Sequence, residues 1–245
     1  NTESSPGVSK HYTHIPTERV IDDMKVLGWS VCDAKEVKAR KSSTMGFQKH
    51  LVVFRNPELS ITGQNGDDVH PQILVTNSHD GKNSFTFNSG LFRMICENGL
   101  VISTVDFGSV KIRHMGYDFE ELQTQIKMMV EELPLTVESM NRMESTELGQ
   151  KEALSLAKEA MDIRFGEEKA KELEFNWEEI LEPTRPEDIA QSLWHVFNVI
   201  QEKIINGNFT YRSNNKIRKA REVKNFTQDQ TINSQLFEKA MEYAS

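Results

Sequence analysis

Apolar residues follow two different periods along the chain. Before residue 116 they form short runs or alternate with polar residues, a pattern typical of β-strands. The predicted strands cover residues 29–39, 47–55, 72–76, 84–87 and 109–115. From residue 117 onward, apolar residues recur every three or four positions, which indicates helices. The predicted helices cover residues 119–133, 137–143, 150–165, 167–177 and 186–206, and Pro134 is expected to interrupt the first helical stretch.

Strands grouped ahead of helices favour an α+β fold over a doubly wound one. We predict an N-terminal twisted antiparallel sheet with short helices, followed by a mainly helical C-terminal half. One short helix is expected to begin at Pro16-Thr17-Glu18 and to end at Gly28. The predicted segments are a flexible tail (1–12), an α+β sheet domain (13–116), an acidic helical region packed on it (117–207), and a basic segment with a C-terminal helix (208–245).

Residues 72–102 contain several predicted secondary-structure elements close together. Asn77-Ser78-His79-Asp80-Gly81 lies between two short apolar runs, and its Asx side chains and glycine suit a reversal of the chain. This segment therefore predicts a β-hairpin. The apolar residues within 91–95 have helical spacing, and Asn98-Gly99 is the expected end of a short helix. Residues 56–70, which are rich in Gly, Asn and Asp, are expected to form a loop.

Composition indicates a soluble globular protein. The chain has 245 residues, of which 37% are apolar and 27% charged. No apolar run approaches the roughly 20 residues that a membrane span needs, and residues 1–10 are polar, so we expect no membrane association and a cytoplasmic location. Cys32 and Cys96 lack metal-ligand spacing, and both are expected to be small buried residues rather than a disulfide.

The net charge of −8 is unevenly distributed. Residues 1–116 hold 13 basic and 12 acidic side chains, residues 117–188 hold 8 and 20, and residues 189–245 hold 8 and 5. Salt screens exposed charges beyond roughly 10 Å, so an acidic middle region leaves the other regions able to attract anions.

Motifs for catalysis are missing from the sequence. It contains no GxSxG, no phosphate-binding loop with its lysine and no GxGxxG. His79 and Asp80 are adjacent, but the other histidines show no metal-ligand spacing, so we favour a hairpin turn over a metal site. We therefore expect no enzyme, no cofactor and no metal, and keep an unrecognised metal-dependent hydrolase at His79 and Asp80 as a third hypothesis.

Two basic clusters suggest phosphate binding. Residues 212–224 hold six basic side chains and one acid, with aromatic residues on both sides, and Tyr211 or Phe226 would stack on bases. A surface helix or a linker is the alternative interpretation of this segment. The other cluster lies on the predicted strands 29–39 and 47–55, where a solvated sheet face is the alternative. The candidate nucleic-acid-binding residues are Lys38, Arg40, Lys41, Lys49, Arg55, Tyr211, Arg212, Lys216, Arg218, Lys219, Arg221 and Lys224.

Four segments of the sequence carry a family resemblance: Asn77-Ser78-His79-Asp80-Gly81, Gly90-Leu91-Phe92-Arg93, Cys96-Glu97-Asn98-Gly99-Leu100 and Phe197-Asn198-Val199-Ile200-Gln201-Glu202-Lys203. Through these segments the sequence resembles a family of phage- and plasmid-borne proteins known as a domain of unknown function. The segments are spread over residues 17–207. The resemblance implies a mobile genetic element as the source, and it implies no reaction.

Residues 20–30 are also similar to the start of ring-forming single-strand annealing proteins. The shared feature is a helix that closes on Gly28-Trp29 and passes directly into a strand, with a basic hairpin behind it. The similarity covers about forty residues and implies a twisted antiparallel sheet over a helix, with single-stranded DNA held against a basic face. The hairpin at 77–81 and the long acidic helical half depart from that pattern.

These observations give a leading hypothesis and an alternative of a different class. The first is a non-enzymatic phage or plasmid protein that binds single-stranded DNA in replication or recombination, with a homo-oligomer possible. The alternative is an anti-defence or host-protein-binding factor that uses the acidic region, where acids exceed bases by twelve over residues 117–188.

Overall fold

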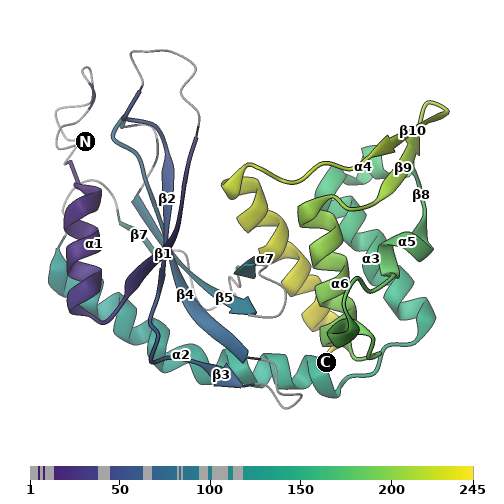
Figure 1. Ribbon diagram of the computed structural model, residues 1–245, viewed down its shortest axis with the longest axis horizontal. Coiled ribbons are helices and arrows are strands. Elements are labelled where there is room, and N and C mark those ends of the chain that lie inside the picture. The colour runs from purple at the N-terminus through teal and green to yellow at the C-terminus, as the bar shows by residue number, and fades with distance from the viewer. Residues whose placement is uncertain are drawn as a thin grey trace. The chain divides into compact units, whose positions relative to one another are not determined.

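The computed structural model describes residues 5, 8, 14–37, 45–62, 68–81, 83, 85–93, 99–100, 110–112 and 118–244. The chain divides into two compact units (Figure 1). Unit 1 comprises Asn1–Thr62 and Asp68–Pro134, and unit 2 includes all residues from Leu135 onward. The four segments predicted from the sequence stay a prediction.

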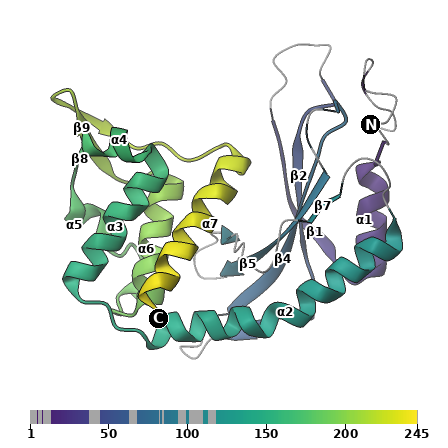
Figure 2. The same ribbon diagram turned by 180° about the vertical axis from the view of Figure 1, so that it is seen from behind.

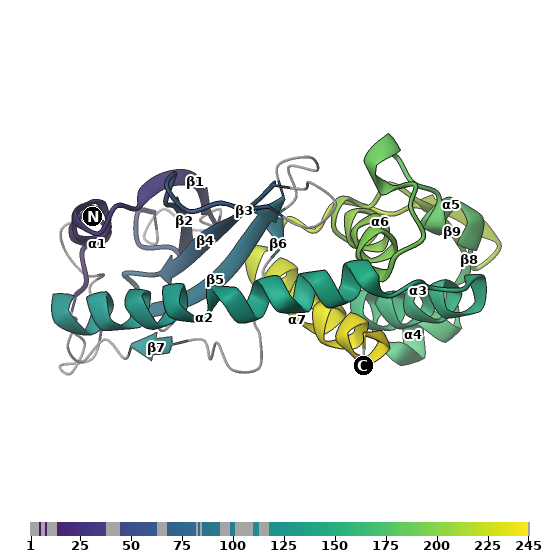
Figure 3. The same cartoon turned by 90° about the horizontal axis from the view of Figure 1, so that it is seen from below.

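Unit 1 is built on an antiparallel sheet. Its strands are β1 (Ser30–Glu36), β2 (His50–Arg55), β3 (Ile61–Thr62), β4 (Asp68–Asn77), β5 (Phe85–Arg93), β6 (Gly99–Leu100) and β7 (Val110–Ile112). The order is β1-β2-β4-β5-β6, with β3 paired to β4 and β7 paired to β5. Figure 3 shows β4 and β5 side by side, and in their register Val75 faces Phe87 and Thr76 faces Thr86. The predicted antiparallel sheet and the hairpin at 77–81 are therefore confirmed.

Two helices complete the core of unit 1. Helix α1 (Thr17–Val26) buries Val20 and Met24, and Gly28 follows its end with a φ of 85°. The predicted helix before Gly28 is thus confirmed. The long helix α2 (Phe119–Ser145) contributes Leu122 and Ile126 to the same core. Apolar side chains from β2, β4 and β5 join them, including Val52, Phe54, Ile73, Val75, Phe85 and Phe87.

Several local predictions in unit 1 are wrong. Every residue of the edge strand β1 is exposed, so Cys32, which was expected to be buried, lies exposed on it. Part of the predicted loop at 56–70 forms β3 and the start of β4. Residues 91–93 belong to strand β5 rather than to a helix, because they pair with residues 69–71 of β4. Pairing with a distant strand has overridden the helical spacing. Cys96 lies outside the described residues.

Helix α2 runs through Pro134 without interruption. Proline has no amide hydrogen, so the helix lacks one backbone hydrogen bond at this position. The structure nevertheless continues the helix to Ser145, and the predicted break is wrong. The apolar residues on both sides of Pro134 therefore belong to one helix.

Unit 2 is mainly helical. Its helices are α3 (Gln150–Phe165), α4 (Glu167–Lys171), α5 (Trp177–Leu181), the 3-10 helix η3 (Pro186–Asp188), α6 (Leu193–Asn206) and α7 (Phe226–Tyr243). Helices α3, α6 and α7 pack against one another (Figure 2). Their core residues include Leu156, Phe197, Ile200, Leu236 and Phe237. The predicted α+β fold, with a mainly helical C-terminal half, is confirmed.

Unit 2 also contains a small sheet that the sequence pattern did not predict. Strands β8 (Glu174–Phe175), β9 (Thr210–Ser213) and β10 (Lys216–Lys219) are antiparallel in the order β10-β9-β8. Consequently the predicted helix 167–177 ends at Lys171. Asn214 and Asn215 connect β9 to β10 with φ values of 50° and 59°, and a tight hairpin turn needs such positive values.

Each helix in the described part of the chain is too short or too polar to span a lipid bilayer.

Candidate nucleic-acid interface

The β9–β10 hairpin and the segment after it display the C-terminal basic cluster. The four residues of β10 are all exposed, because β10 is the outer strand of its sheet. We define the hairpin surface as Tyr211 with the six predicted cations, namely Arg212, Lys216, Arg218, Lys219, Arg221 and Lys224. All six cations are exposed. The structure therefore places these predicted cations at the surface of the β9–β10 hairpin and of the segment that follows it.

The strand register places an aromatic ring beside a cation. Tyr211 faces Arg218 of β10 on one side and Phe175 of β8 on the other, so the three side chains share a face of the sheet. Phe165, the last residue of α3, packs against this row. Its ring centroid lies 5.4 Å from that of Tyr211 and 5.7 Å from that of Phe175. Tyr211 is thereby held in place, while part of its surface remains accessible.

A pocket opens beside this row of rings. It has a volume of about 840 Å³ and is lined by Arg164, Phe165, Tyr211, Arg218, Lys219, Ala220 and Arg221. We call it the Arg164 pocket. Four of its lining residues are cations and none is a carboxylate. Such a lining favours a ligand that carries negative charge.

Arg164 occupies the last turn of α3 and is fixed by its neighbours. Its Nη2 donates a hydrogen bond to the backbone carbonyl of Arg221. Its guanidinium carbon lies 5.5 Å from the centre of the Phe165 ring and 5.8 Å from that of Phe209. Burial lowers the pKa of Arg164, and the phenol of Tyr211 acts in the opposite direction. An arginine keeps its charge at neutral pH, so this cation remains available to an anion.

The opposite face of the hairpin carries acids. Arg212 Nη1 lies 3.6 Å from a carboxylate oxygen of Glu174, and both side chains are exposed. Glu179 accepts hydrogen bonds from the backbone and hydroxyl of Thr210, at 3.1 and 2.7 Å. Within the described part of the chain, the other five cations of the hairpin surface and Arg164 form no ion pair with a carboxylate. In the described part of the chain, Arg212 is therefore the one cation of the hairpin surface that a nearby carboxylate partly neutralises.

The backbone at Gly207 lies close to that of Ala220 and Arg221, and this contact positions one side of the Arg164 pocket. Gly207 ends α6 with a φ of 74°, and a Cβ there would lie 2.4 Å from the carbonyl carbon of Arg221. Two backbone hydrogen bonds hold the same crossing: Ala220 N donates to Phe209 O, and Val223 N donates to Ile205 O. The absence of a side chain at Gly207 thus lets Ala220 and Arg221 lie against the end of α6.

The N-terminal basic cluster is only partly described. Lys38, Arg40 and Lys41 lie outside the described residues, whereas Lys49 and Arg55 belong to unit 1. Burial lowers the pKa of Lys49, and Arg55 ends strand β2 in register with Gln72. A role for these five residues in nucleic-acid binding stays a prediction.

Phe226 and His79, for which the sequence suggested functional roles, are both buried. Phe226 is 5% exposed and belongs to the core, so its side chain is not accessible for stacking on a base. His79 is buried with two other imidazoles, with ring centroids 4.6 Å from His14 and 5.2 Å from His50. Among the described residues, no group of three or more His, Cys, Asp or Glu has the arrangement of a metal site.

The polar side chains around His79 fix the start of helix α1. Thr17 Oγ1 lies 2.7 Å from His50 Nε2 and 3.4 Å from His79 Nε2. Asn77 Nδ2 donates to Ile15 O and to Thr17 Oγ1, while its Oδ1 accepts from the Ser78 amide. These bonds give the hairpin turn and its neighbours a structural role.

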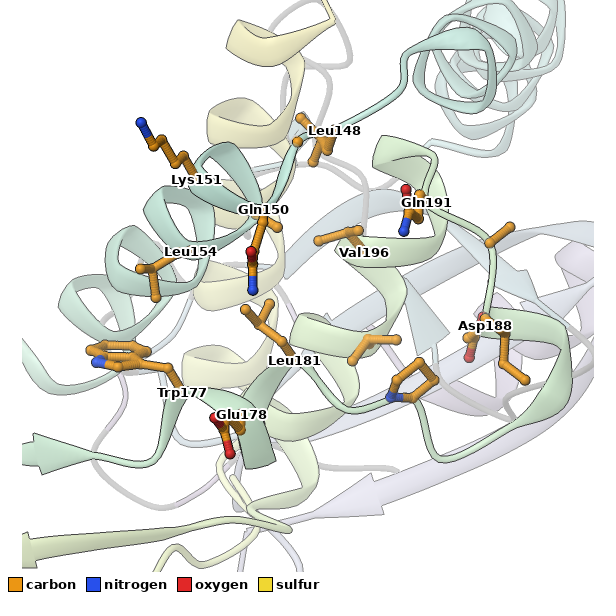
Figure 4. A pocket seen from close by; sticks show the side chains of 16 residues that line it. Leu148, Gln150, Lys151, Leu154, Trp177, Glu178, Leu181, Asp188, Gln191 and Val196 are labelled. Atoms are coloured by element: carbon orange, nitrogen blue, oxygen red, sulfur yellow. The ribbon is translucent and has the colours of Figure 1, made fainter.

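A second cavity in unit 2 is mostly apolar. It has a volume of about 780 Å³, and Leu148, Leu154, Trp177, Leu181 and Val196 are among its lining residues (Figure 4). The buried carboxylate of Asp188, which also lines it, pairs with Arg185, and Arg185 in turn pairs with Glu202. The lining also includes Lys151 and Glu178, so this cavity holds charges of both signs and lacks the purely positive lining of the Arg164 pocket.

Sequence reasoning missed Arg164 and Phe165. They precede the hairpin surface by more than forty positions, so no linear cluster includes them. The available signal was weak: an arginine and an aromatic residue in the last turn of a helix, where cations are common for electrostatic reasons. Their contribution becomes visible only when the end of α3 lies beside β9 and β10.

Comparisons with known proteins identify relatives. The family described as a domain of unknown function (DUF932) matches residues 6–237 of this chain. The UPF0380 protein YafZ of Escherichia coli strain K12 is 32% identical over 205 residues, which are 84% of this chain and 72% of that protein. The UPF0380 protein YfjQ of the same organism is 31% identical with the same coverage. No solved structure matches the chain. These descriptions name no activity.

Proposed function

The chain belongs to the DUF932 family, and we propose that it binds single-stranded DNA without catalysing a reaction. The hairpin surface and the Arg164 pocket would contact phosphates, and Tyr211 would stack on a base. The observation that carries this proposal is the lining of the Arg164 pocket, with four cations, two aromatic rings and no carboxylate. Single-strand binders combine cations along a groove with aromatic side chains in this way.

Local charge supports the proposal despite the net charge of −8. Cations that form no pair with a carboxylate keep their full attraction for phosphate, and each phosphate contact releases condensed counterions. The acids of the chain are concentrated at residues 117–188, and salt screening limits their repulsion of DNA bound elsewhere.

The ring of Tyr211 favours a single strand over a duplex. A base offers its flat face to an aromatic side chain only when it is unstacked from its neighbours, and this is easy in a single strand. Tyr211 lies on the same face as Arg218, so a strand could place a base on the ring and a phosphate on the guanidinium.

The biological setting is part of the proposal. The resemblance to phage- and plasmid-borne proteins favours replication or recombination of a mobile element as the process. Association of several copies along a strand, contacts from Lys38, Arg40, Lys41, Lys49 and Arg55, and a host-protein partner for the acidic region stay predictions.

Fluorescence anisotropy with a labelled oligo-dT at low salt tests the proposal. We expect binding by the full chain and a strong loss in the triple variant Lys216→Glu, Arg218→Glu, Lys219→Glu. Lys158→Glu is the control, because Lys158 is an exposed residue of α3 with no ion pair within the described part of the chain. Failure of the full chain to bind, or an equal loss per charge in the control, would rule the proposal out.

A competing duplex of the same length tests the preference for single strands. We expect it to displace the labelled oligo-dT less effectively than unlabelled oligo-dT does. Equal displacement would remove the role assigned to Tyr211.

A further inference from the structure

Four positive side chains converge on the Arg164 pocket. Arg164, Arg218, Lys219 and Arg221 line it, and the lining includes no carboxylate. Like charges gathered in a partly enclosed space repel one another, and salt screens them less than it screens charges on an open surface. A bound anion removes this repulsion. The pocket therefore favours a compact group with more than one negative oxygen.

Arg164 presents a donor that lacks an acceptor. Its Nη2 is used by the backbone carbonyl of Arg221, which fixes the plane of the guanidinium. Its Nη1 is buried and has no hydrogen-bond partner among the residues that the structure describes. A buried donor without an acceptor is costly, and most such groups in folded proteins have a partner. Arg164 also lines the pocket, and its planar guanidinium matches the geometry of a phosphate bound there.

A stacking ring lies within the same pocket. Tyr211 is held by Phe165 and Phe175, and in the strand register it faces Arg218. A ring fixed before binding loses little conformational entropy when a base packs on it. The volume of about 840 Å³ is within the range of roughly 300–1,000 Å³ that is usual for small-molecule sites. One phosphate and one base can therefore be accommodated together.

We infer that the Arg164 pocket is a subsite for one nucleotide, with the phosphate on Arg164 and Arg218 and the base on Tyr211. This inference rests on the proposed function, because it identifies the unit of the bound strand that the protein recognises. The phosphate can belong to the interior of a strand, to its end or to a free mononucleotide. Cations of the hairpin surface outside the pocket, such as Lys224, contact phosphates without contacting bases.

Calorimetric titration of the purified full chain tests the subsite directly. The probes are dTMP, thymidine and inorganic phosphate. Stacking and phosphate binding act together only in dTMP, so we expect dTMP to bind at least roughly tenfold more tightly than either of the other two. Binding of dTMP no tighter than that of inorganic phosphate would overturn the inference.

Variants distinguish binding of dTMP in the pocket from general electrostatic attraction between dTMP and the protein surface. Arg218→Gln changes an exposed side chain and should weaken dTMP roughly tenfold. Tyr211→Leu should remove the advantage of dTMP over inorganic phosphate. Arg164→Lys keeps the charge but loses the planar fork, and should also weaken dTMP; thermal unfolding checks that each variant is folded. Lys158→Gln, at an exposed cation of α3 outside the pocket and the hairpin surface, is the matched control and should leave dTMP affinity unchanged; an equal loss in this control would contradict the subsite.

Oligo-dT with and without a 5′-phosphate distinguishes the sources of the phosphate. Tighter binding of the phosphorylated strand would assign the subsite to a strand end, and equal binding would assign it to an internal nucleotide. The two proposals fail separately. Binding of oligo-dT without binding of dTMP would overturn the subsite and keep the proposed function. Binding of dTMP without binding of oligo-dT would overturn the proposed function.

Discussion

Two residues, Gly207 and Arg164, hold the backbone of Arg221 at the edge of the Arg164 pocket. Gly207 has a positive φ and lies directly against the backbone of Ala220 and Arg221. Arg164 then uses the carbonyl of Arg221 as its acceptor. A position with no ligand contact thus sets the location of two cations that line the pocket.

Gly207→Ala should destabilise unit 2 and weaken DNA binding. The left-handed backbone alone costs about 1–2 kcal/mol for a residue with a Cβ. Here the Cβ would also lie 2.4 Å from a backbone carbon that cannot rotate away. Urea unfolding measures the free energy of unfolding.

Gly28→Ala is the matched control for this substitution. Gly28 also has a positive φ, but its Cβ would meet only the side-chain amide of Asn56, at 3.3 Å. We expect a smaller loss there. A loss at Gly207 no larger than that at Gly28 would contradict the role given to the backbone crossing.

Loss of Arg185 from its two buried ion pairs, with Asp188 and with Glu202, should be strongly destabilising, because buried negative charge is then less well compensated. The side chain of Arg185 is 20% exposed, and those of Asp188 and Glu202 are 0% and 9% exposed. Arg185→Gln would remove a cation from two carboxylates that lie in a poorly solvated site. We expect a loss of roughly 2–4 kcal/mol in the free energy of unfolding, measured by urea titration.

Arg212→Gln provides the comparison for the buried pair. Arg212 pairs with Glu174 on the surface, where water and salt already weaken the attraction. We expect this change to alter stability by less than about 1 kcal/mol. Similar losses for Arg185→Gln and Arg212→Gln would show that burial does not strengthen the first pair.

Among the elements, the β9–β10 hairpin carries the proposed function. Its turn residues Asn214 and Asn215 both have positive φ, which asparagine tolerates better than most residues. Asn215→Gly should keep the hairpin and its DNA affinity, because Asn-Gly suits this kind of turn. Asn215→Val should destabilise the turn by about 1–2 kcal/mol and weaken oligo-dT binding, as measured by anisotropy. Equal affinity for the two variants would indicate that the hairpin geometry does not position the cations.

The sequence predicted buried elements better than exposed ones. The predicted helix 150–165 coincides with α3, because Leu156, Ala157 and Ala160 form a buried stripe. Strand β10 was missed because all four of its residues are exposed, so no alternation marks it. Residues 91–93 were assigned to a helix because short apolar runs suit both periods, and only the pairing with β4 decides between them.

Only part of the candidate site was predictable, because some of its residues meet through tertiary packing. The six cations of 212–224 are adjacent in sequence, so composition alone reveals them. Arg164 and Phe165 line the same pocket because the end of α3 packs beside the small sheet. The spacing of residues in the sequence does not predict that tertiary contact. Local pattern thus identified the charge but not the pocket.

For the whole molecule, the proposed function requires a chain with a net charge of −8 to attract a polyanion. Five of the six cations of the hairpin surface form no ion pair within the described residues, and acids exceed bases by twelve at residues 117–188. Binding that depends on a few local phosphate contacts has a defined salt dependence. Each contact with a single strand contributes about −0.7 to the slope of log K against log salt concentration.

The salt dependence of oligo-dT affinity is therefore the most direct measurement. We expect a steep negative slope for the full chain. The triple variant Lys216→Glu, Arg218→Glu, Lys219→Glu should have a slope shallower by about 2, because three phosphate contacts are lost. A slope that is unchanged in this variant, or near zero in the full chain, would contradict DNA binding by the hairpin.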